Sequence, residues 1–355
     1  MMGAIDTDER PVVLVWEVTQ ACELACEHCR ADAQPDRHPD ELSTAEGKAL
    51  LREAAQFGDD QLVVLSGGDP LVRDDLPELV EYGVDRGLQM TLTPSGTAHL
   101  TPERIRELAD AGLRRLALSI DGATADSHDS FRGEECFADT LAAARAANEA
   151  GIPVQINTTV CASTAEDLPG IRTLVSDLDA VLWSVFFLVP IGRGTALDPV
   201  SPARAERIAS WLCSVRESED FGIKTTEAPF FRRVAAQRGE GGPGARRPGI
   251  TAGDGFAFVS HVGEVYPSGF LPESAGTVRG ESVVDIYRDS DLFESLRDPD
   301  ALTGKCGACE YRGLCGGSRS RAYACTGDPL ASDPLCAYVP ESYDGPIPRQ
   351  EVARS

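Results

Sequence analysis

The segment VVLVWEVTQACELACEHC, residues 12–29, decides the fold class. Its apolar first half predicts a β-strand, and the loop that follows carries Cys22, Cys26 and Cys29 in a Cys-x3-Cys-x2-Cys pattern. Ferredoxin-type clusters and closed structural zinc sites each use four protein ligands. Three thiolates can hold three irons of a cubane cluster, so the pattern predicts a cluster with one open iron. The alternatives are a zinc site that His28 or a distant residue completes, or a chance grouping of cysteines.

Short apolar segments alternate with amphipathic segments after this loop. The predicted strands are Val12–Val18, Leu62–Leu65, Gln89–Thr93, Arg115–Ile120, Val154–Val160 and Val181–Val189. Amphipathic stretches between them predict helices, so the chain is expected to form βα units around a parallel sheet. Six units favour an α/β fold with a partial (βα)6 TIM-type barrel. In barrels the chemistry lies at the carboxyl ends of the strands, where the cysteine loop would also lie.

Composition limits the partners and the compartment. The net charge of −24 disfavours nucleic acid and anionic lipid as ligands. No run of 18 apolar residues occurs, and residues 1–10 lack the features of a signal peptide, so we expect a cytoplasmic protein without membrane contact. Scarce lysine and many carboxylates resemble the composition of proteins from salt-loving archaea. Among eleven cysteines, Cys136, Cys161 and Cys213 are isolated and expected in the core.

The three-cysteine loop resembles the signature of the radical S-adenosylmethionine (SAM) enzymes. The resemblance implies a [4Fe-4S] cluster at Cys22, Cys26 and Cys29 whose open iron binds the amino and carboxylate groups of SAM. It also implies that reductive cleavage of SAM releases a 5′-deoxyadenosyl radical, which abstracts hydrogen from a substrate. An electron donor such as ferredoxin or flavodoxin would then be a partner.

The segment Ser66-Gly67-Gly68-Asp69-Pro70 after the second predicted strand resembles the Gly-Gly-Glu-Pro motif of this family. That motif offers its backbone to the amino group of SAM, which implies cofactor-binding roles for Gly67, Gly68 and Asp69. Glycines permit close backbone approach to a ligand. Asp69 departs from the usual glutamate, and an ordinary turn is the alternative interpretation.

Three polar residues near the ends of later strands complete the expected SAM site. The resemblance places Ser119 at the SAM ribose or carboxylate, Arg132 at the carboxylate and Asn157 at the nucleoside. A surface salt bridge is the alternative for Arg132, and a structural role in the core is the alternative for Asn157.

A second set of cysteines lies near the C-terminus, at Cys306, Cys309, Cys315 and Cys336. A zinc ribbon is one interpretation. The spacing also resembles the SPASM extension of radical SAM enzymes, which carries auxiliary [4Fe-4S] clusters. Ser268 and Ser318 stand where that extension has ligands of an inner cluster, so we expect a shortened SPASM-like domain with one auxiliary cluster. Cys325 could replace Cys336 as the fourth ligand.

These patterns predict a division of the chain. The expected parts are a tail at 1–10, the barrel and following helices at 11–238, a flexible loop at 239–252, the hairpin and SPASM-like domain at 253–340, and a tail at 341–355.

The segment CGGSRSRAY, residues 315–323, resembles the enzymes of the alternative haem pathway. The resemblance implies a tetrapyrrole substrate, iron-coproporphyrin III, of which two propionates become vinyl groups. A tetracarboxylate needs cations, so we expect substrate contacts from arginines, with simple surface charge as the alternative. The candidates are Arg30, Arg193, Arg319 and Arg321. The competing functions are a SPASM-type peptide maturase and an electron-transfer protein with two clusters.

Overall fold

The computed structural model describes residues 5–239 and 250–350, and a single sheet of ten strands forms its centre. The strand order is β10-β9-β8-β1-β2-β3-β4-β5-β6-β7. The strands are β1 (Val13–Thr19), β2 (Leu62–Gly67), β3 (Gln89–Leu92), β4 (Arg115–Ser119), β5 (Val154–Val160), β6 (Leu182–Phe187), β7 (Gly222–Thr226), β8 (Phe256–Val259), β9 (Glu264–Tyr266) and β10 (Gly276–Thr277). Most of the predicted flexible loop at 239–252 lies outside the described residues, as do the last five residues.

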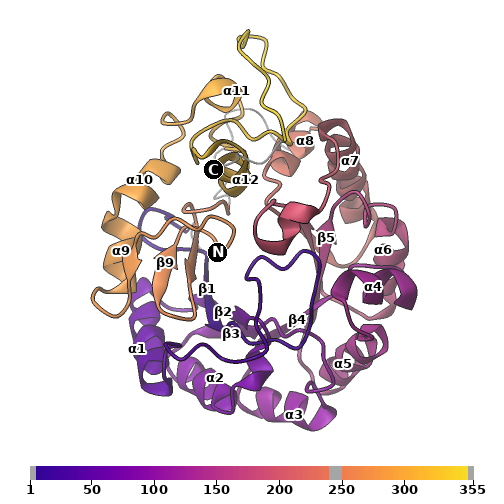
Figure 1. The fold of residues 1–355 in the computed structure, drawn as a ribbon, viewed down its shortest axis with the longest axis vertical. Helices are drawn as coiled ribbons and strands as arrows, with labels where there is room; N and C mark the ends of the chain where they lie inside the picture. Colours follow the sequence, from indigo (N-terminus) through magenta and orange to yellow (C-terminus); the bar gives the residue numbers. More distant parts are fainter. Residues whose placement is uncertain (1–4, 240–249, 351–355) are drawn as a thin grey trace.

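Helices cover the outer face of this sheet (Figure 1). Leu14, Trp16 and Val18 of β1 are fully buried in the core beneath the helices, whereas Val13 and Val15 alternate with them and line the interior cavity of the barrel. Ser43 and Glu46 form a capping box that fixes the start of the first helix. The helices are α1 (Thr44–Ala54), α2 (Leu76–Val84), α3 (Pro102–Asp110), α4 (Ala125–Arg132), α5 (Phe137–Glu149), α6 (Leu168–Asp177), α7 (Pro202–Ser218), α8 (Phe230–Gln237), α9 (Val283–Asp289), α10 (Asp291–Arg297), α11 (Gly304–Gly307) and α12 (Arg319–Thr326).

The predicted α/β fold with a parallel sheet is confirmed, and the sheet extends beyond the six predicted strands. β7 pairs in parallel with β6, and no strand was predicted there because Gly-Ile-Lys-Thr-Thr has no apolar run. At the other edge β8 pairs in parallel with β1, and β8 and β9 form the predicted hairpin. The hairpin therefore continues the barrel sheet.

The C-terminal segment lies where the arc of helices is open. In Figure 1 the elements α9 to α12 (orange to yellow) occupy the side between α1 and α8, with α9 beside α1. Within the described ranges, no helix is long and apolar enough to cross a membrane.

Candidate active site

The cysteine loop begins directly after β1, at the carboxyl end of the sheet. The Cys22 amide donates to the Gln34 carbonyl over 2.8 Å, which folds the loop back on itself. Cys22 and Cys26 are 8% exposed, and all three cysteines of the loop line one cavity of about 320 Å³ inside the barrel. The structure thus brings the predicted ligand set together on the expected face of the barrel.

The donor set of this loop fits an iron–sulfur cluster better than a single ion. Residues 5–239 and 250–350 contain one group of three or more possible metal ligands whose ligand atoms all lie within 4.8 Å of one another. This group consists of His128, Asp129 and Cys136. Cys22, Cys26 and Cys29 are therefore more widely spaced than the ligands of a zinc ion. Two backbone amides point at these sulfurs, Leu24 N to Cys22 Sγ at 3.4 Å and Ala33 N to Cys29 Sγ at 3.5 Å. Burial raises the pKa of Cys26 to about 11, so this thiol stays protonated unless a metal binds it.

Gly67 and Gly68 form a cradle against the start of the cysteine loop. Gly67 has a φ of +149°, and a Cβ on it would overlap the Thr19 carbonyl oxygen. A Cβ on Gly68 would overlap the Ala21 carbonyl oxygen, and the Gly68 amide donates to Thr19 O over 2.9 Å. Both glycines line the cavity beside the cysteines, so their backbone is accessible to a ligand there.

Replacing Gly68 with alanine should destabilise this cradle, because the new Cβ meets backbone that cannot swing away. We expect a loss of about 1–3 kcal/mol in the free energy of unfolding, as for other overpacked positions, together with weaker SAM binding. Urea unfolding and isothermal titration with SAM measure the two effects. Gly280→Ala is the matched control, since a Cβ there has open space around it. Equal stability and SAM affinity in both variants would contradict the cradle.

Asp69 lies behind the cradle and does not line the cavity. Its carboxylate is 1% exposed and accepts from the Thr97 hydroxyl at 2.9 Å and from the Leu71 amide at 3.2 Å. The Ser95 hydroxyl in turn donates to the Gly68 carbonyl at 2.7 Å and lies 3.2 Å from Cys22 Sγ. The buried Asp69 carboxylate therefore organises the loop that carries Ser95, and a contact of Asp69 with SAM stays a prediction.

Arg132, Ser119 and Asn157 come together on the cavity wall. Arg132 is buried at the end of α4, pairs with Asp121 at 3.4 Å and donates to the Ser95 carbonyl at 3.1 Å. Burial alone would raise the pKa of Asp121, but its electrostatic interaction with the His28 ring, the charge of Arg132 and the Thr159 amide hold this pKa below its usual value. The surface-salt-bridge interpretation of Arg132 was wrong, because this ion pair is buried within the site.

His28 lines the same cavity. Its ring stacks on Phe131 with centroids 4.7 Å apart, and burial lowers its pKa to about 4, so the ring is neutral at pH 7. Its Nδ1 is buried and has no hydrogen-bond partner among the described residues. The ring thus presents an unsatisfied nitrogen beside the cysteine loop.

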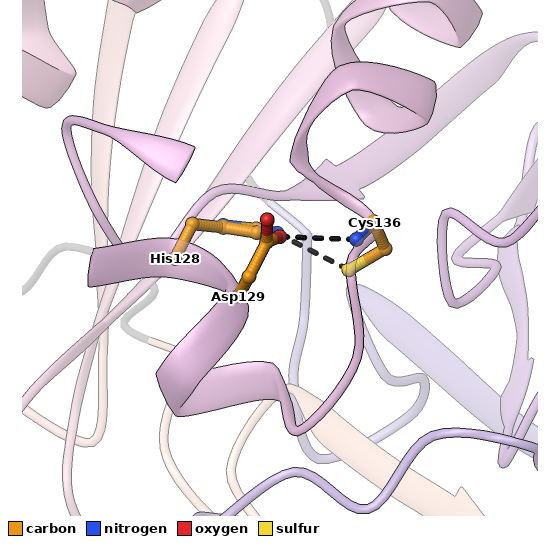
Figure 2. A group of neighbouring side chains, drawn as sticks. All are labelled: His128, Asp129 and Cys136. Atoms are coloured by element: carbon orange, nitrogen blue, oxygen red, sulfur yellow. Dashed lines mark hydrogen bonds between the residues drawn. The ribbon is translucent and has the colours of Figure 1, made fainter. Parts of the chain in front are cut away.

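His128, Asp129 and Cys136 form a separate group that fastens α4 to α5 (Figure 2). Asp129 Oδ1 accepts from the Cys136 and Phe137 amides at 3.0 and 2.8 Å, which caps the start of α5. His128 Nδ1 accepts from the Asp121 amide at 3.2 Å, and its Nε2 lies 3.5 Å from Cys136 Sγ. These existing bonds account for the cluster, which supports Asp121 and Arg132 from behind.

The four predicted ligand cysteines near the C-terminus also lie around one cavity. Cys306, Cys309, Cys315 and Cys336 line one small cavity of about 20 Å³, whereas Cys325 is not among its lining residues. Nitrogen donors face two of the sulfurs. Cys306 Sγ lies 3.4 Å from the Asp333 amide and 3.8 Å from Arg319 Nη2. Cys336 Sγ lies 3.8 Å from Arg233 Nη2. Four thiols around one cavity, with donors aimed at their sulfurs, fit a closed cluster site.

The four candidate substrate arginines have different surroundings. Arg30 lines the main cavity, but its guanidinium pairs with Glu17 and lies 4.5 Å from the Phe258 ring centroid. Arg319 also lines it, and Nη1 donates to the Pro329 and Ala331 carbonyls at 2.8 Å each.

Arg193 and Arg321 lie outside the cavity lining, contrary to expectation. Arg193 Nε donates to the Cys26 carbonyl at 2.9 Å and thereby braces the cysteine loop. Arg321 is 1% exposed, pairs with Asp333 at 3.2 Å and donates to three carbonyls. These bonds and its burial leave a substrate carboxylate no access to Arg321, whereas Nη2 of Arg193 has no partner among the described residues.

Two charged lining residues were not predicted from the sequence, Lys224 and Glu227. Lys224 belongs to the unpredicted strand β7, and Glu227 directly follows it. Glu227 has a left-handed φ of +55°. Its carboxylate accepts hydrogen bonds from three serine hydroxyls. These belong to Ser318, to Ser320 at 2.8 Å and to Ser268 at 3.3 Å. Ser268 and Ser318 are the two serines at the positions of the missing inner-cluster ligands, and here they hold a carboxylate.

Comparison with known proteins agrees with this arrangement. Residues 16–172 match the model of the radical SAM superfamily. The chain is 43% identical to an AdoMet-dependent heme synthase of Methanosarcina barkeri, over 93% of this chain and 97% of that one. It is 39% identical to an AdoMet-dependent heme synthase of Nitratidesulfovibrio vulgaris, over 92% of each chain. The fold is similar to that of Streptococcus suis SuiB bound to SAM, with a TM-score of 0.74 and 16% identity over 93% of this chain and 78% of SuiB.

The family binds a [4Fe-4S] cluster and SAM, in accord with the open three-cysteine set and the glycine cradle beside it. The likeness to the heme synthases extends over almost the whole of both chains. The chain therefore belongs to the radical SAM superfamily and is a radical SAM enzyme of the same group as the AdoMet-dependent heme synthases.

Proposed function

We propose that the enzyme converts two propionates of iron-coproporphyrin III to vinyl groups and so makes haem b. The observation that carries the proposal is the 43% identity to an AdoMet-dependent heme synthase over nearly the full length of both chains. The cavity supports it, because it joins the cysteine loop to a wall with cationic side chains suited to a ligand rich in carboxylates.

The chain's own residues divide the task. Cys22, Cys26 and Cys29 would hold the first cluster, and the backbone of Gly67 and Gly68, with Ser119, Arg132 and Asn157, would hold SAM. When bound, these two groups supply a 5′-deoxyadenosyl radical. The buried Arg132 lines the cavity next to the cysteine loop, and its Nε has no partner among the described residues, which leaves a charged donor for the carboxylate of SAM.

The balance of the reaction supports a second redox site. Conversion of one propionate to a vinyl group removes one hydrogen atom, one molecule of CO2 and one electron. We propose that Cys306, Cys309, Cys315 and Cys336 hold an auxiliary [4Fe-4S] cluster, a group that supplies one-electron chemistry. Arg319 supports this assignment, since it lines the substrate cavity and also contacts Cys306 Sγ at 3.8 Å. A ferredoxin or flavodoxin would supply the electron for SAM cleavage.

Anaerobic incubation of the reconstituted enzyme with SAM, a reductant and iron-coproporphyrin III tests the function. We expect a porphyrin product whose mass is lower by two formic-acid equivalents, together with 5′-deoxyadenosine, detected by mass spectrometry. A reaction without SAM is the control. Formation of 5′-deoxyadenosine without any change in the porphyrin would refute the haem assignment and favour a peptide substrate.

A further inference from the structure

The wall of the substrate cavity contains a cation, Lys224, that has no partner among the described residues. It lies on β7, in register with Ser184 of β6, and lines the cavity together with Val13 and Gln155 on the inner face of the barrel. The other two lysines are engaged, Lys48 with Glu78 and Lys305 with the Cys336 carbonyl. Within the described ranges, Lys224 has no hydrogen-bond or ion-pair partner.

The other cationic side chains of this cavity already have partners. Arg30 pairs with Glu17, Arg132 pairs with Asp121, and Arg319 donates to backbone carbonyls. Among the lysines and arginines that line the cavity, Lys224 is thus the one without a hydrogen-bond or ion-pair partner in the described part of the chain. The chain has 57 acidic residues, so the missing partner does not reflect a shortage of carboxylates.

This arrangement costs stability in the free protein. Burial and the nearby charge of Arg115 on β4 together lower the pKa of Lys224 to about 8. The Nε of Arg115 is also buried and lacks a partner among the described residues. These two cations, for which the described residues supply no counter-ion, create a positive potential that an anionic ligand would offset.

We propose that Lys224 binds a carboxylate of the substrate within the barrel, and that the charge of Arg115 strengthens this contact. The inference rests on the proposed function for the identity of the ligand, a tetrapyrrole with four carboxylates. One cavity contains both Lys224 and the cysteine loop, so a ligand with several carboxylates could place one propionate at the reactive end and another at Lys224.

The test is a titration of the reconstituted enzyme with iron-coproporphyrin III, followed by the porphyrin absorbance. Lys224→Met preserves the length of the side chain and removes the charge, and it should weaken binding at least tenfold, as expected for a lost hydrogen bond to a charged group. Lys224→Arg should restore most of the affinity. Lys224→Gln repeats the test if the methionine variant does not fold, which circular dichroism and iron content would reveal. Lys48→Met is the matched control, because Lys48 is on the surface and far from the cavity lining.

A second ligand isolates the carboxylate. The tetra-amide of iron-coproporphyrin III keeps the macrocycle and the side-chain length, so Lys224→Met should leave its affinity nearly unchanged. Equal affinity of wild type and Lys224→Met for the tetracarboxylate would overturn the role of Lys224 and leave the proposed function standing. Failure of the wild-type enzyme to bind the porphyrin at all would overturn both proposals.

Discussion

Cys26→Ala is expected to reduce SAM cleavage to the rate of a protein-free blank. Cys26 lies in the middle of the three-cysteine loop and lines the cavity beside Gly67 and Gly68. Removal of one of three ligands leaves a cluster that the loop cannot hold, because the remaining sulfurs provide only two bonds. Release of 5′-deoxyadenosine from SAM under reducing conditions measures the effect, and the iron content should fall by about four per chain.

Cys161→Ala is the matched control for this experiment. Cys161 is also buried, at 1% exposure, and lies in the small core cluster with Phe131 and Leu188, but it does not itself line the cavity. It should retain full iron content and SAM cleavage. Continued SAM cleavage by Cys26→Ala would refute the role of the loop as cluster ligand.

Cys315→Ala is expected to separate the two cysteine sets. Burial raises the pKa of Cys315, and the side chain lines the small cavity with the other three C-terminal cysteines. With two [4Fe-4S] clusters, wild type should contain about eight irons per chain and the variant about four. SAM cleavage should persist, whereas the porphyrin product should be lost, because the electron that leaves the substrate has no acceptor.

The comparison of Cys325→Ala with Cys336→Ala completes this test. Cys325 is buried but lies outside the small cavity, whereas Cys336 lines it. The first variant should keep about eight irons and the second should lose about four, as measured by iron and sulfide analysis. A wild-type protein with about four irons would exclude the auxiliary cluster.

Much of the barrel was predictable because its pattern is local. Strand β5 (Val154–Val160) begins and ends where predicted, and β1 and β2 lie within two residues of their predicted bounds. Apolar residues dominate β1 and β2, and in β5 buried positions alternate with partly exposed ones. β7 escaped prediction because Lys224 and two threonines interrupt its apolar pattern. Its place is set by backbone pairing with β6, a long-range contact that no window of sequence contains.

The arginines show the limit of prediction within the site. Arg193 and Arg321 occur in segments that resemble a substrate site, yet the folded chain uses both for its own carbonyls and carboxylates. A guanidinium has five donors, and the partners that occupy them come from distant parts of the chain. The Glu227 carboxylate has the same origin, since its three serine partners belong to two later segments.

The sequence by itself indicated the reaction class, because the spacing of Cys22, Cys26 and Cys29 resembles the radical SAM signature and lies within one short loop. The tertiary structure alone decided which charges remain available inside the cavity. That outcome depends on which donors and acceptors from separate strands meet, and it left Arg30 and Arg132 paired but Lys224 without a partner among the described residues.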